Sequence, residues 1–246
     1  MELMLLAAGR GSRFAEKGIT IPKPLVLFQE KPLFWWAVQS ALSSGMIKNV
    51  HFTILEEHIF THSIDEVIRH YFPLAKLHVL KKLTQGAAET AAESLEGIDP
   101  FLPISILDCD LAFGLSSIQA KKIDFTNNQA TAVLCTFQSS NPAYSYVRFD
   151  KNNNVEGAVE KQVVSSHAIA GMYSFASAEV YLRYYQKYAK ICSYKELYIS
   201  GLVDLMAQEK NRVLTADIFP HISMGTPEEL ARIDSQVVQT LSWYKP

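Results

Sequence analysis

Residues 5–27 read LLAAGRGSRFAEKGITIPKPLVL, a short apolar run that breaks into a glycine-rich turn and is followed by an arginine and a lysine. The apolar run at its start has the length of a buried strand. Gly9 and Gly11 then let the backbone turn sharply and bring its N–H groups close to an anion. Arg13 offers a planar fork of donors suited to phosphate oxygens, and Lys23 offers a compact cation between two prolines. The segment therefore predicts a phosphate site directly after the first strand.

Known glycine-rich motifs do not explain this stretch. A glycine pair after a strand is also typical of an ordinary tight turn. A dinucleotide-binding fold expects G-x-G-x-x-G with an acidic residue about 20 positions later, but Phe14 stands where the third glycine would be. A P-loop expects G-x-x-x-x-G-K-[ST], which is missing. The phosphate interpretation therefore depends on the cations that follow the glycines.

Composition excludes several classes of protein. The chain has 246 residues, of which 48% are apolar, so one domain with a sizeable core is expected. Its formal net charge of −2 argues against a nucleic-acid surface. The N-terminal apolar run is too short to span a membrane, and Glu2 replaces the positive charge of a secretory signal. Cys109, Cys135 and Cys192 are widely spaced, which predicts reduced thiols in the cytoplasm.

Strands and helices alternate through the first half of the chain. Strands are expected at 3–7, 49–55, 76–80 and 103–107, and helices at 32–44, 64–71 and 87–95. Such alternation predicts a doubly wound, mostly parallel sheet whose ligands bind at the carboxyl ends of the strands. In the second half, strand-like segments are expected at 130–137, 144–150, 154–161, 168–175 and 213–218, and helices around 177–189, 194–209 and from residue 227.

Asp108 and Asp110 flank one residue at the end of the expected strand at 103–107. Alternate side chains of an extended chain share a face, so both carboxylates are expected on one side. Two carboxylates suit Mg²⁺, which takes oxygen ligands and keeps waters that phosphate oxygens can replace. The alternative is one capping or turn aspartate with a solvated neighbour. The apolar strand before them favours the metal site.

The string A-A-G-x-G-x-R followed by P-K-P-L resembles the start of the sugar-phosphate nucleotidylyltransferases, which make nucleoside diphosphate sugars. This resemblance implies a GT-A-like, Rossmann-like fold with a small antiparallel sheet on the acceptor side. It implies a single domain over 1–246, with a nucleotide-binding half at 1–130 and an acceptor-binding half at 131–246. We expect a monomer or homodimer that binds neither nucleic acid nor a membrane.

The resemblance also assigns roles to residues of the first half. Arg13, Lys23 and Asp110 would be catalytic, and Asp110 with Asp108 would bind Mg²⁺. The nucleotide would be bound by Leu6, Ala7, Ala8, Gly9, Gly11, Gln85, Gly86 and Ala87. Residues 83–90 read LTQGAAET, which is equally typical of a plain helix start capped by Thr84.

The second half matches the family less closely. Glu160 and Lys161 lie where relatives contact the acceptor's hydroxyls or phosphate, and Gly171 lies where relatives have a glycine near the acceptor. Gln162 replaces the usual proline, and Ser145 replaces a glycine. Ser223 replaces a second metal-binding aspartate, so either Asp110, Asp108 and the substrate phosphates hold the metal, or Asp217 or a water substitutes.

The reaction implied by the resemblance is attack of an acceptor phosphate on the α-phosphorus of a nucleoside triphosphate, with release of pyrophosphate. The acceptor oxygen is already anionic, so no general base is needed. Analogy favours CTP, then UTP, as donor. The acceptor is expected to be a sugar 1-phosphate, or a phosphorylated amino acid or polyol of a surface-polymer pathway. Two alternatives stay open: a glycosyltransferase that uses D-x-D for a nucleotide sugar, and a non-catalytic nucleotide-binding module.

Overall fold

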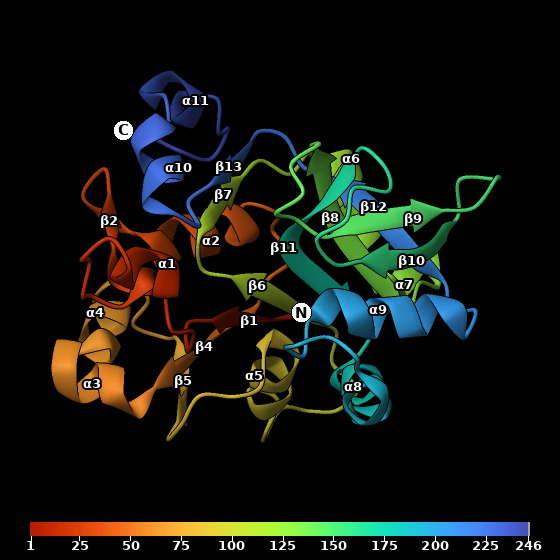
Figure 1. The fold of residues 1–246 in the computed structure, drawn as a ribbon, viewed down its shortest axis with the longest axis horizontal. Helices are drawn as coiled ribbons and strands as arrows, with labels where there is room; N and C mark the ends of the chain where they lie inside the picture. Colours follow the sequence, from red (N-terminus) through yellow and green to blue (C-terminus); the bar gives the residue numbers. More distant parts are fainter. Residues whose placement is uncertain (246) are drawn as a thin grey trace.

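A sheet of nine strands forms the centre of the structure, a computed structural model that describes residues 1–245 (Figure 1). β1 (Glu2–Leu6) lies between β4 (Asn49–Leu55) and β6 (Ile104–Asp108), and both neighbours run parallel to it. β5 (Lys76–Leu80) adds a fourth parallel strand beside β4. The alternating first half of the chain thus forms the parallel part of the sheet, as expected.

Antiparallel strands from the second half continue the same sheet. β11 (His167–Phe175) pairs antiparallel with β6, with β8 (Ala132–Gln138) and with β9 (Tyr146–Phe149). β10 (Val155–Val159) pairs with β9, and β12 (Val213–Asp217) runs parallel to β8. One strand, β11, therefore joins the parallel and antiparallel parts.

Two small antiparallel sheets complete the strand inventory of the described residues. β7 (Leu111–Phe113) pairs with β13 (His221–Ser223), and β2 (Leu27–Phe28) pairs with β3 (Lys31–Pro32). The fold class predicted from the sequence is confirmed: a mostly parallel central sheet with helices, plus small antiparallel sheets.

Helices cover both faces of the main sheet because its side chains alternate between them. Leu3 and Leu5 of β1 pack on one face and Met4 on the other. The first face is covered by α2 (Leu33–Leu42) and α4 (Ile64–Tyr71), and the second by α5 (Ala87–Glu93), α8 (Ala178–Ile191) and α9 (Ile199–Gln208). Figure 1 shows α8 and α9 next to each other.

The remaining helical segments are short. They are α1 (Ser12–Ala15), α3 (Glu56–His62), α6 (Ser117–Ala120), α7 (Phe125–Asn128), α10 (Pro227–Arg232), α11 (Ser235–Gln239) and the 3₁₀ turns η1 (Lys23–Leu25) and η2 (Lys121–Ile123). Within residues 1–245, no helix combines the length and apolar character that a membrane crossing requires.

The C-terminal segment holds the first loop in place. Phe14 of α1 is buried in a cluster with Trp36 of α2 and with Met224 and Val238 from the end of the chain. Trp243 Nε1 donates a hydrogen bond to the carbonyl of Phe113 (2.8 Å). The glycine-rich loop is thus fixed by residues more than two hundred positions away.

A buried polar cluster lies at the amino ends of β1, β4 and β5. His51 Nε2 lies 2.7 Å from Glu2 Oε2, and its Nδ1 lies 3.0 Å from His78 Nε2. Asn49 donates to the other Glu2 oxygen (2.9 Å). Burial lowers the pKa of both His51 and His78, and for His78 the neighbouring His51 and Lys76 add to this effect.

This cluster predicts loss of stability in mild acid. Since both histidine pKa values are lower in the folded than in the unfolded chain, the unfolded chain binds more protons as the pH falls below about 6.5. The free energy of unfolding should therefore fall between pH 7.5 and 5.5, by at most about 1.4 kcal/mol per pH unit and histidine. Urea unfolding of His78→Gln should show a shallower pH dependence than the wild type. The matched control is His70→Gln, an exposed position, and equal slopes in both variants would contradict the prediction.

Candidate active site

A cavity of about 560 Å³ opens at the carboxyl ends of β1 and β6. Leu6 and Asp108 are paired in register, so the glycine-rich loop begins beside Asp108. The structure brings predicted site residues from both halves of the chain into the cavity wall: Arg13, Ala87, Asp108, Asp110, Glu160, Lys161 and Gly171.

Lys23 and Asp110 form an ion pair at the edge of this cavity. Lys23 Nζ donates to Asp110 Oδ2 at 2.8 Å, and the two side chains are 19% and 16% exposed. Burial opposes the charge of Lys23, but the nearby negative charges outweigh burial and hold its pKa above the ordinary value. Lys23 therefore places a fixed positive charge next to Asp110, the aspartate expected to bind the metal.

Gly11 allows the two parts of the first motif to touch. Its φ is +60°, a left-handed conformation that favours glycine, and a Cβ placed there would lie 3.2 Å from Lys23 Cβ. Ala7 and Ala8 are buried, and Ala7 N–H still donates to Thr53 at the end of β4 (2.8 Å). Residues 6–11 thus connect β1 to the Lys23 turn, and none of them is among the residues that line the cavity, which begin at Ser12.

Asp108 and Asp110 ionise differently although they are neighbours. Burial, and then the charge of Asp110, raise the pKa of Asp108 to about 7. Burial acts on Asp110 in the same sense, but the charge and hydrogen bond of Lys23 prevail and hold the pKa of Asp110 below its ordinary value. Asp110 is thus the permanently charged member of the pair.

Gly171 lies against Asp108 because β11 bulges there. The pairing of β11 with β8 shifts register between Ile169 and Tyr173, and Gly171 has a φ of +72°. A Cβ at Gly171 would lie 2.5 Å from Asp108 Oδ2, closer than real Cβ contacts come. Glycine therefore makes room for the Asp108 carboxylate.

Glu229 is a cavity residue that the sequence patterns did not single out as functional. A Cβ placed on Gly225 would lie 3.0 Å from Asp110 Oδ2, 3.2 Å from Glu229 Oε2 and 3.7 Å from Arg13 Nη1, so these three side chains converge. Glu229 Oε1 accepts a hydrogen bond from Tyr144 (3.2 Å). Its Oε2 is buried and has no hydrogen-bond partner within residues 1–245.

Glu160 and Lys161 lie in the cavity wall that the second half of the chain contributes. Glu160 accepts hydrogen bonds from Ser145 and Ser200, and Lys161 Nζ donates to the Tyr198 hydroxyl at 3.0 Å. All five side chains line the cavity. Ser145, one of the departures from the family pattern, is therefore part of the site.

Residues 85–87 are divided between two surfaces. Gly86 lies against the backbone of Leu197, with Gln85 and Ala88 each hydrogen-bonded to Leu197 (3.0 and 2.8 Å). Ala87 lines the main cavity, whereas Gln85 lines a neighbouring depression of about 360 Å³ with residues 79–84. The structure thus does not bring Gln85 and Ala87 to the same surface.

His221 lines the cavity as a neutral ring. It stacks on Phe137, with ring centroids 3.7 Å apart, and burial lowers its pKa to about 4. Ser223 lies nearby in the cavity wall. Asp217 is not among the residues that line the cavity. Its carboxylate accepts a hydrogen bond from Thr136 (2.7 Å) on the neighbouring strand β8. Asp217 is therefore not placed to substitute for Ser223.

The donor set of the site suits a hard divalent cation. Asp108 and Asp110 offer carboxylate oxygens, and no hydrogen bond from residues 1–245 occupies the Asp108 carboxylate. No group of three His, Cys, Asp or Glu side chains within the described chain is arranged as a complete metal site. Mg²⁺ is commonly bound by one or two carboxylates, with water and substrate phosphates as its other ligands. The residues present fit that mode of binding.

A family model described as nucleotidyl transferase matches residues 2–236. The chain belongs to the nucleotidyl transferase family. Members of this family transfer nucleotides, so the match agrees with the resemblance of the glycine-rich loop and the P-K-P segment.

Solved structures support the fold of this nucleotidyl transferase. A nucleoside-diphosphate-sugar pyrophosphorylase from Vibrio cholerae RC9 is similar with a TM-score of 0.78 and 22% identity, covering 94% of this chain and 98% of that one. The inositol-1-phosphate CTP transferase of T. maritima is similar with a TM-score of 0.76 and 15% identity, covering 97% and 93%. Both span nearly the whole chain, so no large part of the fold is unmatched.

Proposed function

We propose that this nucleotidyl transferase moves a nucleoside monophosphate from a triphosphate to a phosphorylated small acceptor, such as a sugar 1-phosphate, and releases pyrophosphate. The observation that carries the proposal is the partly buried Lys23–Asp110 pair, whose aspartate lines one cavity together with Arg13, Glu160 and Lys161. Arg13 and the adjacent Lys23 are cations suited to a triphosphate, and Glu160 and Lys161 are groups suited to a second substrate.

The chemistry asks the protein to hold two anions in line. An oxygen of the acceptor phosphate attacks the α-phosphorus, and the bond from that phosphorus to the bridging oxygen of the β-phosphate breaks. Arg13 and Lys23 would bind the phosphates and stabilise the charge that develops on their oxygens. Asp110 and Asp108 would hold Mg²⁺, which when bound neutralises phosphate charge.

We propose CTP as the first donor to test and UTP as the second. The T. maritima structure, which has this fold and similar length, is described as a CTP transferase, which supports the order of testing. The loop from Leu6 to Gly11 and residues 85–87 would bind the nucleotide. Acceptors of a surface-polymer pathway remain the proposed class.

The test is a panel of four nucleoside triphosphates crossed with sugar 1-phosphates and with phosphorylated polyols and amino acids, in the presence of Mg²⁺. We expect pyrophosphate release that needs both substrates, highest with CTP. A parallel arm offers nucleotide sugars to sugar acceptors and measures release of nucleoside diphosphate. Activity in that arm alone would replace the proposal by glycosyl transfer, and triphosphate binding without turnover in either arm would indicate a binding module.

A further inference from the structure

We infer that Ser145 and Ser200 are positioning residues that turn Glu160 so that one carboxylate oxygen, Oε1, faces the acceptor. This inference rests on the proposed function. Both serine hydroxyls donate to the other oxygen, Oε2, at 2.7 Å in the case of Ser200. The Glu160 side chain is only 9% exposed, although it lines the cavity. We call this arrangement the serine clasp.

The serine clasp joins three separate elements of the fold. Ser145 directly precedes β9, Glu160 directly follows β10, and Ser200 lies in the first turn of α9. Ser200 is fully buried, so its hydroxyl needs an internal partner, and Glu160 supplies one. The clasp thus ties the end of β10 to the start of β9 and to the first turn of α9 through one carboxylate oxygen.

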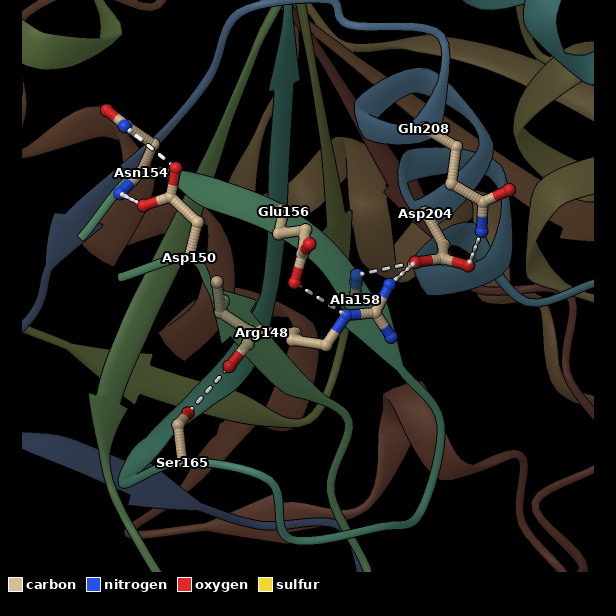
Figure 2. Close-up of polar contacts among 9 residues, drawn as sticks. Arg148, Asp150, Asn154, Glu156, Ala158, Ser165, Asp204 and Gln208 are labelled. Atoms are coloured by element: carbon tan, nitrogen blue, oxygen red, sulfur yellow. Dashed lines mark hydrogen bonds and ion pairs between the residues drawn. The ribbon is translucent and has the colours of Figure 1, made fainter. Parts of the chain in front are cut away.

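A second contact fixes α9 to the strand that carries Glu160. Asp204, four residues after Ser200 and on the same helix face, accepts hydrogen bonds from Ala158 N–H (3.1 Å) and Arg148 Nη2 (3.2 Å). Figure 2 shows Ala158 and Arg148 pointing at this carboxylate, with Gln208 on its other oxygen. A side chain at Gly157 would overlap the same ion pair. Helix α9 therefore contacts this segment twice: Asp204 binds the backbone of Ala158 in β10, and Ser200 binds the carboxylate of Glu160, two residues later.

The free oxygen of Glu160 defines the chemistry of the ligand. Oε1 makes no hydrogen bond within residues 1–245, and its nearest cation, Lys161 Nζ, is 3.9 Å away and bonded to Tyr198. An ionised carboxylate only accepts hydrogen bonds. An acceptor that binds here must present a donor, so we assign the acceptor class as phosphorylated compounds with a hydroxyl or a protonated amine near the phosphate.

The test uses the acceptor that the wild type turns over fastest, with pyrophosphate release as the readout. Ser145→Ala and Ser200→Ala should each raise the KM for the acceptor about tenfold, since each removes a hydrogen bond to a charged group. The KM for the triphosphate should stay within about twofold, because its subsite is untouched. Ser145→Thr keeps the hydroxyl and should restore the wild-type KM. The matched control is Ser165→Ala, whose hydroxyl bonds the Val147 carbonyl instead.

A double-mutant cycle separates positioning from general stability. In a Glu160→Ala background, the two serine variants should add little to the acceptor KM, because the oxygen to which both hydroxyls donate is gone. Two results would overturn the clasp. One is that the serine variants raise the KM for the triphosphate as much as the KM for the acceptor. The other is that they raise the acceptor KM by the full amount when the Glu160 carboxylate is already absent.

A structural measurement keeps the clasp testable if the proposed function fails. Should the wild type release no pyrophosphate with any acceptor, the proposed function is wrong. A crystal structure of the double variant Ser145→Ala, Ser200→Ala then decides the clasp by itself. A Glu160 carboxylate that leaves its present orientation supports the clasp, and one that keeps it overturns the clasp.

Discussion

We expect the replacement of Lys23 with alanine, or of Asp110 with asparagine, to lower turnover at least about a hundredfold. Each change removes one charge of the buried ion pair. Without Lys23, Asp110 loses the cation that it contacts directly and only the more distant Arg13 remains near it, and without Asp110 the carboxylate expected to bind the metal is lost. Removing one preorganised charge from such a site costs about two to three orders of magnitude in turnover. The measurement is steady-state pyrophosphate release by purified variants.

Lys17→Ala is the matched control for Lys23→Ala. Lys17 also forms a lysine–carboxylate pair, with Glu228 at 2.7 Å, but both side chains are about half exposed. Exposed pairs contribute little, so this variant should keep near-normal turnover and stability. Unfolding midpoints of all three variants show whether the fold survives. Near-normal turnover in folded Lys23→Ala or Asp110→Asn would rule out the proposed function.

Gly171→Ala is expected to lower turnover more than about tenfold at saturating substrates. The added Cβ would meet Asp108 Oδ2 at 2.5 Å, so either the carboxylate or the bulge in β11 must move. Displacement of the carboxylate changes the place where Mg²⁺ would bind, which predicts a higher Mg²⁺ requirement. The measurement is turnover as a function of Mg²⁺ concentration.

Gly18→Ala separates backbone strain from the contact with Asp108. Gly18 has a similar left-handed φ, +79°, but a Cβ there meets nothing within 4 Å. Backbone strain should lower the free energy of unfolding of both variants by about 1 kcal/mol, because alanine disfavours a left-handed conformation. Only Gly171→Ala should change the Mg²⁺ requirement. The same kinetic change in both variants would show that strain, and not the contact, is responsible.

Local patterns predicted the parallel part of the fold well. The strand expected at 103–107 is β6 (Ile104–Asp108). Asp108 is its last residue and Asp110 follows two positions later. The helix expected at 64–71 matches α4. Apolar runs and helical periodicity are local properties, so they can be read without knowing the partners of a segment. The helix α3 at Glu56–His62 was not predicted, since none of its residues is fully buried and Ile59 is only partly buried against the core.

Contacts between distant residues could not be predicted in this way. Lys23 and Asp110 are 87 positions apart, and only the family resemblance placed both in one site. β7 and β13 have three residues each, too few to show a strand pattern, and they form only by pairing with each other.

Ser200 and Glu229 were missed as site residues for a related reason, and Ser145 was noted only as a departure from the family pattern. Serine and glutamate are common on protein surfaces, and nothing in their neighbours along the chain marks them as functional. Their meaning comes from what they face in the folded protein: a shared carboxylate in the case of the serines, and the cavity in the case of Glu229.

The pairing of β11 with β6 has a consequence for how the protein is made. Residues 172–175 of β11 cover the edge of β6 that β1 leaves open. A nascent chain that has emerged only as far as residue 130 therefore exposes an unpaired edge of apolar sheet, which invites aggregation. Residue 175 must therefore be synthesised before the open edge of β6 can be fully paired.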